Sequence, residues 1–375
     1  MRNALGIAAA LFCAACESNG SAATAPPAAS ISVSGRVERS STAAVQLIAG
    51  NAAVPGAVFT VEPAANASVI AGDSVQFLSG GELTVSARGL AAGDSVHASA
   101  VLEVPVPPTI VFDRLTNGNR DIWSVQLDGG ALTRLTSDTS DDREPTARGG
   151  HVYFISYRTG TAQVFKTPIA GGAATRVSGD NVTVGYPALA PGGAMLAFAS
   201  GSGFPKITVS DTAGGSETRF AAADAGSSGA IEERPAWSPA GDRIAYMTTR
   251  DGWAGIYVGQ TTGAAGSATP LVSGANGYAS VEPAWSFDGN TIAFASDRDG
   301  PTDLYAVTIA TGAVARLTTS GNVGQPAWLP DGRLVFTQSV GAGAYALRWL
   351  DPADSAHVHA IPTGAGSAEH AAPTP

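Results

Sequence analysis

The chain has 375 residues, 44% of them hydrophobic, which is enough to bury one large core or two smaller ones. Its 46 glycines and 23 prolines favour many tight turns over long helices, so we expect an all-β fold. A formal charge of -10 with only two lysines, Lys166 and Lys206, argues against an extended phosphate-neutralising surface and against nucleic acid as a partner.

Residues 1–15 have the composition of a secretory signal peptide. Arg2 is followed by an apolar run too short to span a bilayer, and small residues precede Cys16. The ending AAC resembles the lipobox of bacterial lipoproteins, although Cys13 stands where that motif usually has leucine. The resemblance implies lipidation of Cys16 and a membrane anchor in the cell envelope, with the outer membrane, on its periplasmic or surface side, as the expected location. Ordinary secretion is the alternative.

Residues 16–30 are small, polar and proline-containing, and we expect them to form a flexible tether after the anchor. Cleavage before Cys16 would leave no cysteine downstream. The exported protein would therefore have to be stable without an internal disulfide, through a large core.

Residues 31–106 contain short β-rich runs such as VQLIAG and LTVSARG, separated by Gly, Asn and Pro every eight to twelve residues or so. This spacing predicts a small β-sandwich. The segment GLAAGDSVHASAVLEVPVPP resembles the close of a bacterial Ig-like domain, with Phe59 where such domains often have tryptophan. The resemblance implies a spacer or an adhesion-type module.

Residues 107–375 contain a repeat. Its anchor is the proline of P-A-W-like segments, which recurs every 42 to 48 residues at Pro145, Pro187, Pro235, Pro283 and Pro326. An aromatic residue follows in phase in the next segment, and each unit ends on a run such as TRLTS or ARLTT. Four short strands per unit at this period predict the blades of a β-propeller.

The residue types of the repeat fit blades that stack face to face. In DRIAYMT, Ile244 and Tyr246 point to one side of the strand and Ala245 to the other, so both faces are expected to be dry. The tryptophans of the P-A-W segments are expected to pack between blades. They are Trp237, Trp285 and Trp328.

The first unit begins at Thr109 without a P-A-W-like strand, which would leave an open inner edge. The segment HAAPTP, His370 to Pro375, matches the missing strand in phase. We therefore predict a ring of six blades that is closed by the last residues of the chain.

The phrases PAWSPAGDRIAY and PAWSFDGNTIAFASDRDGPTDLY closely resemble the WD40-like propeller repeat of the TolB family, and the resemblance covers Thr109 to Pro375. It implies a six-bladed propeller. Related repeats also occur in regulatory domains of prolyl oligopeptidase-type peptidases and in other surface proteins. TolB proteins carry a small α/β domain ahead of the propeller, where this chain is expected to have a sandwich.

A residue that breaks the phase of the repeat is free to serve a ligand. The residue before the P-A-W proline varies most, and all six such residues would start innermost strands and form a polar ring at one mouth of the channel. They are Glu144, Tyr186, Arg234, Glu282, Gln325 and His370. The surrounding loops would add aromatic and acidic groups suited to a partner contact. These are Asp141, Asp142, Tyr157, Phe204, Trp253 and Tyr278. A merely solvated channel rim is the alternative.

Motifs for chemistry are absent. The sequence lacks G-x-S-x-G, H-E-x-x-H and G-x-x-x-x-G-K-[ST]. A peptidase would also need a hydrolase domain after the propeller, and we expect none because the sequence ends where the ring is predicted to close. His357 and His359 alternate on the outermost strand of the last blade, where surface histidines are more common than a metal site. The carboxylates of SDRDGPTD lack the full calcium-loop pattern, and Arg158, Arg250 and Arg298 of such loops are expected to serve turn geometry. We expect no metal and no cofactor.

Two functions remain open. The favoured one is a non-catalytic, monomeric envelope lipoprotein that binds an envelope protein, a peptide or a glycan. The alternative is a propeller enzyme, such as a carbohydrate lyase or hydrolase, that uses Glu144, Arg234, Glu282 and His370 at the channel mouth.

Overall fold

The computed structural model describes residues 29–34, 42–49, 52–55, 57–62, 64, 67–70, 74–77, 81–91, 94–104 and 107–374, except 180–182, 216 and 224–228. The predicted signal peptide, Cys16 and nearly all of the tether lie outside these residues. The chain divides into two compact units, Met1–Pro107 and Pro108–Pro375. Within the described part of the chain, no helix has the length and apolar character needed to cross a membrane.

The first unit consists of two antiparallel sheets. One has the strand order β1-β2-β6-β5, with the short β3 beside β2, and the other has the order β4-β7-β8. Both sheets contribute to one core, which includes Val45, Phe59 and Val85. The strands are β1 Ala29–Ser34, β2 Thr42–Ala49, β3 Ala52–Ala53, β4 Val58–Glu62, β5 Ala67–Ile70, β6 Ser74–Phe77, β7 Gly81–Ala91 and β8 Asp94–Val104.

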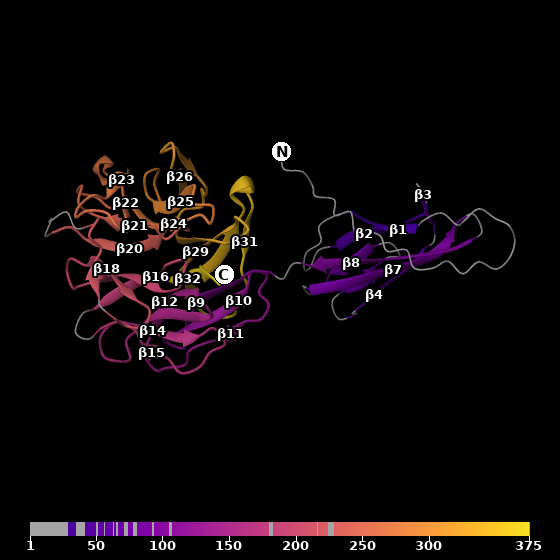
Figure 1. Ribbon diagram of the computed structural model, residues 1–375, viewed down its shortest axis with the longest axis horizontal. Helices are drawn as coiled ribbons and strands as arrows, with labels where there is room; N and C mark the ends of the chain where they lie inside the picture. The colour runs from indigo at the N-terminus through magenta and orange to yellow at the C-terminus, as the bar shows by residue number, and fades with distance from the viewer. Residues whose placement is uncertain are drawn as a thin grey trace. The chain divides into compact units, whose positions relative to one another are not determined.

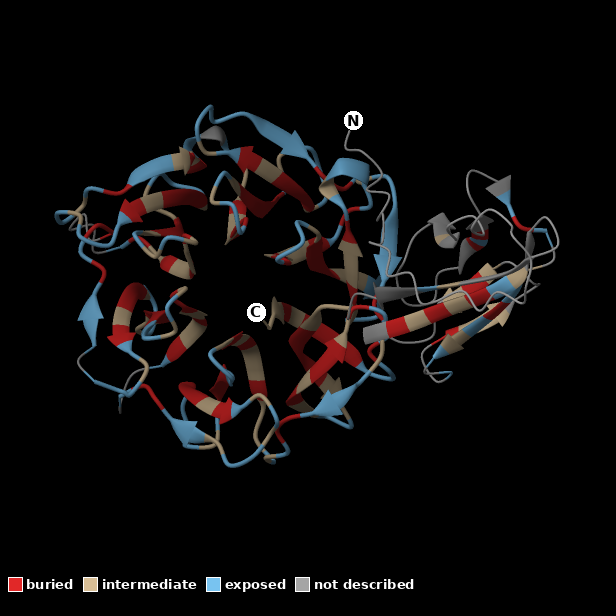
Figure 2. Cartoon of the chain, turned by 45° about the vertical axis from the view of Figure 1, so that its right-hand side comes forward, coloured by how far each residue is buried: buried red, intermediate tan, exposed pale blue. Residues whose placement is uncertain are grey.

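The second unit consists of six four-stranded antiparallel sheets, which confirms the predicted six-bladed propeller. The sheets are arranged in a ring (Figure 2). Blade 2 contains β12 Asp142–Arg148, β13 His151–Ser156, β14 Gln163–Pro168 and β15 Thr175–Arg176. Blade 3 contains β16 Val184–Leu189, β17 Met195–Ser200, β18 Lys206–Asp211 and β19 Thr218–Arg219. Blade 4 contains β20 Glu232–Trp237, β21 Arg243–Thr248, β22 Gly255–Gln260 and β23 Thr269–Val272.

The last two blades follow the same plan. Blade 5 contains β24 Ser280–Trp285, β25 Thr291–Ser296, β26 Asp303–Thr308 and β27 Val314–Arg316. Blade 6 contains β28 Val323–Trp328, β29 Leu334–Gly341, β30 Ala344–Leu350 and β31 Val358–Ala360. Two short 3-10 helices, Gly274–Asn276 and Pro352–Asp354, lie in connections.

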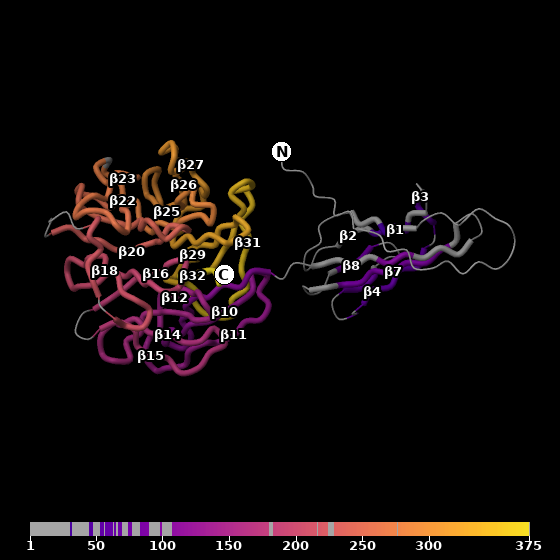
Figure 3. The backbone as a smooth tube through the Cα atoms, in the orientation of Figure 1, coloured from indigo at the N-terminus to yellow at the C-terminus, as the bar shows by residue number. Residues whose placement is uncertain are grey.

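Blade 1 closes the ring with strands from both ends of the unit. It contains β9 Thr109–Thr116, β10 Asn119–Gln126, β11 Thr133–Arg134 and, innermost, β32 Ser367–Pro373. Ala368 pairs with Arg114 and Pro373 with Ile110. The C-terminal strand therefore lies beside the first strand of the propeller, as predicted (Figures 1 and 3).

The blades pack through both faces of their sheets. Ile244 and Tyr246 belong to the core cluster shared with blade 3, whereas Ala245 belongs to the cluster shared with blade 5. The predicted opposite orientation of these side chains is confirmed. Trp237 and Trp328 also lie between blades, and each indole N–H donates to a carbonyl of the preceding blade, Ala188 at 3.0 Å and Ala284 at 3.1 Å.

The two ends of each blade form two faces of the propeller. In blade 4 the start of the inner strand at Glu232 pairs with Thr248 at the end of the second strand, and Thr248 pairs with Gly255 at the start of the third. We call the end of the blades where the inner strands begin the mouth face, and the other end the opposite face. Loops between second and third strands therefore lie on the mouth face.

Candidate functional site

The six predicted ring residues meet around the channel. Together with the residues that follow them, they line a cavity of about 150 Å³. Each lies at a register shift of its inner strand, such as the one between Glu233 and Ala236, and each has a left-handed backbone with φ between 52° and 60°. This conformation costs free energy for a non-glycine residue, and it recurs in all six blades. We therefore interpret the bulge as a specific feature of the channel and not as an irregularity of one strand. The set is Glu144, Tyr186, Arg234, Glu282, Gln325 and His370.

Arg234 connects three blades across one side of the ring. Its guanidinium donates to Glu282 Oε1 at 2.7 Å, and Cζ lies 4.3 Å from the centre of the Tyr186 ring. Burial raises the pKa of Tyr186, and the positive charge of Arg234 opposes that shift. The stacked cation and its carboxylate form a rigid part of the rim.

Backbone amides of the ring donate to acidic or amide side chains of the preceding blade. The Tyr186 amide donates to Glu144 Oε2 at 2.7 Å, and the Gln325 amide donates to Glu282 Oε2 at 2.6 Å. The His370 amide donates to Gln325 Oε1 at 3.0 Å. Bonds of this kind satisfy N–H groups that the bulges remove from the strand ladder.

His370 lies between the ring and a buried ionic layer. Its Nδ1 lies 2.6 Å from Oδ1 of the fully buried Asp113, and its Nε2 lies 2.8 Å from the side-chain nitrogen Nε2 of Gln325. Arg120 pairs with both Asp113 and Glu369 beneath. Burial lowers the pKa of His370, but the charge and hydrogen bond of Asp113 outweigh it, with help from Glu144 and Glu369, so the pKa is raised.

The sequence did not predict this ionic layer. Asp113, Arg120 and Glu369 come from two ends of the propeller and meet only because β32 pairs with β9. The signal that could have found them is the closure itself, which aligns Glu369 with Asp113.

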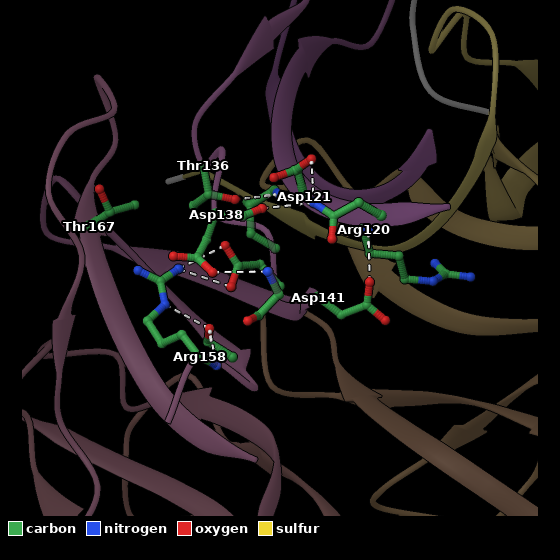
Figure 4. A network of polar contacts seen from close by, with 12 residues as sticks. Arg120, Asp121, Thr136, Asp138, Asp141, Arg158 and Thr167 are labelled. Carbon is green, nitrogen blue, oxygen red and sulfur yellow. Dashed lines mark hydrogen bonds and ion pairs between the residues drawn. The ribbon is translucent and has the colours of Figure 1, made fainter. Parts of the chain in front are cut away.

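The junction of blades 1 and 2 holds a second polar network (Figure 4). The Arg120 amide donates to Asp141 Oδ1 at 2.9 Å, and Arg158 donates to both oxygens of Asp142 at 3.0 and 2.9 Å. Burial opposes ionisation of Asp141, but hydrogen bonds from Arg143 and Arg120 hold its pKa below the usual value. Asp142 is fully buried, so our expectation that it contributes to a partner contact is wrong. Its carboxylate forms an ion pair with Arg158 inside the blade.

The loop aromatics differ in exposure. Tyr157, Phe204 and Trp253 are 44%, 57% and 54% exposed, and each lies in the loop between the second and third strands of blades 2, 3 and 4. Tyr278 is only partly exposed, because the guanidinium of Arg298 stacks 4.8 Å from its ring centre. We call Tyr157, Phe204 and Trp253 the aromatic arc; it follows three adjacent blades on the mouth face.

The recurring loop arginines have a packing role. Arg158, Arg250 and Arg298 each stack on two aromatic rings of their own blade, for example Arg250 at 4.5 Å from the Tyr257 ring centre. They also bond in their loops, as Arg158 does to Ser156 Oγ at 2.8 Å. These residues therefore hold the loops to the blade.

The other candidate ligand groups bond to protein groups. Asp297 accepts from the Ala279 amide, Asp299 from the Tyr305 hydroxyl, and Asp303 from Arg316 and Thr318. His357 bonds to Asp354, and His359 stacks on Trp349 at 4.0 Å. No group of three or more potential metal ligands occurs among the described residues.

Residues 187–365 match the TolB beta propeller domain. Over these residues the propeller is therefore similar to that domain. An uncharacterized protein of Agrobacterium fabrum (strain C58) is 30% identical in an alignment of 139 residues that covers 34% of this chain. The match spans 46%, about half, of that relative's length.

Solved structures agree on the fold. TolB from Acinetobacter baumannii superposes with a TM-score of 0.64 at 15% identity, over 85% of this chain and 83% of that one. A putative TolB from Agrobacterium tumefaciens gives a TM-score of 0.54 at 19% identity, over 68% of this chain and 89% of that one. At this identity the likeness concerns architecture alone.

Proposed function

We propose that this protein is a non-catalytic binding protein of the cell envelope, and that its propeller receives a protein or peptide partner on the mouth face. The observation that carries the proposal is the aromatic arc: three large, exposed aromatic side chains at equivalent loops of adjacent blades. Single exposed apolar residues are ordinary, but aromatic groups gathered on one face favour partner contacts.

The ring favours a basic side chain as the group that enters the channel. Its cavity of about 150 Å³ is smaller than most small-molecule sites, which measure roughly 300–1,000 Å³, and suits a single side chain. Glu144 and Glu282 both line it, and Arg234 neutralises Glu282. Within the described part of the chain, Glu144 forms no ion pair, so a lysine or arginine of the partner would complete it.

Arg234 and Glu282 bind each other, and His370 binds the buried Asp113, which supports binding over catalysis. The observation that favours the alternative, a carbohydrate lyase or hydrolase, is the His370–Asp113 pair. However, Nε2 of His370, the ring nitrogen that does not contact Asp113, lies 2.8 Å from the side-chain nitrogen of Gln325 and does not face open space. Turnover of envelope polysaccharides by the intact protein, lost in His370→Ala, would support the enzyme.

The strand order of the first unit supports our interpretation of this unit as an Ig-like spacer. Its sheet orders β1-β2-β6-β5 and β4-β7-β8 correspond to the A-B-E-D and C-F-G sheets of constant-type immunoglobulin domains, and Phe59 on β4 lies in the common core. We propose that it separates the propeller from a lipid anchor on Cys16. Cys16→Ser should move the protein to the soluble fraction, and unchanged membrane retention with acyl labelling would contradict the anchor.

Affinity capture from envelope extracts tests the binding face. We expect one partner to be recovered by wild-type protein and at least tenfold less by the triple variant Tyr157→Ser, Phe204→Ser and Trp253→Ser. Phe287→Ser is the matched control, because Phe287 is 38% exposed in a turn on the opposite face of blade 5. Equal recovery by the triple variant, with unchanged thermal unfolding, would contradict the proposal, and recovery of a glycan alone would replace the protein partner.

A further inference from the structure

A second cavity lies on the opposite face, between blades 4 and 5, away from the ring and independent of the proposed function. Its volume is about 470 Å³, within the range of small-ligand sites. The walls come from the second, third and fourth strands of blade 4 and from the end of the third strand of blade 5. They are Arg243, Val258, Gly259, Gln260, Ser267, Thr269, Pro270, Leu271 and Ile309. We call this cavity the interblade cleft.

Arg243 is the charged group of the interblade cleft. Its guanidinium lies over the Trp285 ring of blade 5, with Cζ 4.8 Å from the ring centre. Its Nε is buried and has no hydrogen-bond partner among the described residues, and the nearest carboxylate oxygen, on Asp242, is 3.6 Å away. The side chain of Arg243 is 32% exposed and lines the cleft, so part of its guanidinium is open to a ligand that supplies an acceptor.

The same repeat position in blade 6 is satisfied internally. Arg333 stacks on Trp349 with its Cζ 4.8 Å from the ring centre, and its Nε donates to Asp331 Oδ2 at 2.8 Å. Asp331 belongs to the Pro-Asp-Gly turn, and blade 4 has Ala240 in the corresponding Pro-Ala-Gly turn. Arg243 instead stacks on Trp285 of the next blade, and its ion pair with Asp242 is longer, at 3.6 Å.

The indole of Trp285 also distinguishes the interface between blades 4 and 5 from the neighbouring interfaces. Trp237 and Trp328 donate their indole N–H to the preceding blade, whereas the indole nitrogen of Trp285 is buried without a partner among the described residues. Two buried donors thus lie at the junction of blades 4 and 5 without acceptors.

One part of the cleft wall is apolar. Val258, Leu271 and Ile309 are partly buried and pack against the core cluster between blades 4 and 5. Apolar area of this kind contributes roughly 25 cal/mol per Å² when a ligand covers it. One guanidinium beside an apolar wall matches a monoanion with an apolar group, and the neighbouring Asp242 disfavours a second negative charge.

We propose that the interblade cleft binds a carboxylate that carries a compact apolar group, with the carboxylate on Arg243 and the apolar group on Val258, Leu271 and Ile309. Two natural sources share this chemistry: a free short-chain fatty acid and the C-terminal residue of a peptide. The apolar wall fits either one.

Titration calorimetry of the intact protein tests the proposal with three probes. Hexanoate represents the free acid, N-acetyl-leucine represents a peptide C-terminus, and N-acetyl-leucine amide lacks the charge. We expect at least one carboxylate to bind and the amide to bind at least tenfold more weakly. Binding of hexanoate alone would identify the fatty acid, and binding of N-acetyl-leucine alone would identify the peptide end.

Variants locate the binding. Arg243→Gln should weaken carboxylate binding at least tenfold, whereas Arg333→Gln, at the same position of blade 6, should leave it unchanged. Leu271→Asn provides a second test through the apolar wall if Arg243→Gln unfolds at a lower temperature. The proposal is overturned if neither carboxylate binds, if the amide binds equally well, or if folded Arg243→Gln retains wild-type affinity.

Discussion

The Nδ1 atom of His370 lies 2.6 Å from Oδ1 of Asp113, although 257 positions separate the two residues. This contact joins the last strand of the propeller to the first and connects the channel ring to the ionic layer of Arg120 and Glu369. The pairing of β32 with β9 therefore closes the ring and also brings His370 into the candidate site.

Deletion of Glu369–Pro375 should destabilise the whole propeller. It removes most of β32, exposes the inner edge of β9, and costs about 0.5–1.5 kcal/mol for each lost ladder bond, in addition to packing. Thermal unfolding of both forms measures the effect, and His370→Ala in the full chain separates loss of the ring side chain from loss of the strand. Equal midpoints for the truncated and full-length proteins would mean that another segment closes the ring.

The pKa of His370 gives stability a defined pH dependence. Since the folded-state pKa is raised, its contribution is complete below the unfolded value of about 6.5 and is lost as pH rises through the folded-state pKa. Asp113→Asn should lower this pKa in an NMR titration of the imidazole. An unchanged titration curve would show that Asp113 does not stabilise the charged ring.

The side chain of Gln325 contacts His370 at two points. Its side-chain oxygen accepts from the His370 amide and its nitrogen faces His370 Nε2, an arrangement that suits the neutral imidazole. Gln325→Glu offers an acceptor to both groups and should raise the pKa of His370 further. A lower pKa in this variant would contradict the assigned contacts.

The Arg158–Asp142 pair should be worth far more than an exposed pair. Asp142→Ala leaves a partly buried guanidinium without its carboxylate, and we expect a loss of about 3–5 kcal/mol. Asp331→Ala, which breaks the more exposed pair with Arg333, is the control and should cost about 0–1 kcal/mol. Denaturant unfolding compares them, and similar losses would refute the difference in burial.

The left-handed backbone of the ring can be tested at Tyr186, whose φ is 55°. Both Tyr186→Ala and Tyr186→Gly remove the stacking on Arg234, but only glycine relieves the left-handed conformation, at a gain of roughly 1–2 kcal/mol. The glycine variant should therefore unfold at the higher denaturant concentration. The reverse order would exclude backbone strain at this bulge.

The repeat made most of the fold predictable. The in-phase prolines and tryptophans gave six blades, and the unmatched inner edge at Thr109 led to HAAPTP as the closing strand. Residues that broke the phase led to all six ring positions, because equivalent positions in a propeller converge on its axis.

Long-range pairing explains what remained hidden. The sequence predicts that Asp142 is an acidic residue of a loop, and only the folded blade places the guanidinium of Arg158 beside its carboxylate. Tyr278 reads as a loop aromatic, but Arg298 from another loop covers it. The bulge conformation and the free donor of Arg243 likewise depend on contacts between blades that no local pattern encodes.

Site-specific photo-crosslinking in intact cells tests most directly whether the mouth face binds a partner. A photoreactive amino acid would replace Trp253 in one variant and Phe287, on the opposite face, in another, with folding checked by thermal unfolding. The proposed function predicts a discrete covalent adduct from position 253, reduced by Glu144→Gln, and no such adduct from position 287. Absence of an adduct at position 253, or equal adducts from both positions, would contradict binding through the mouth face.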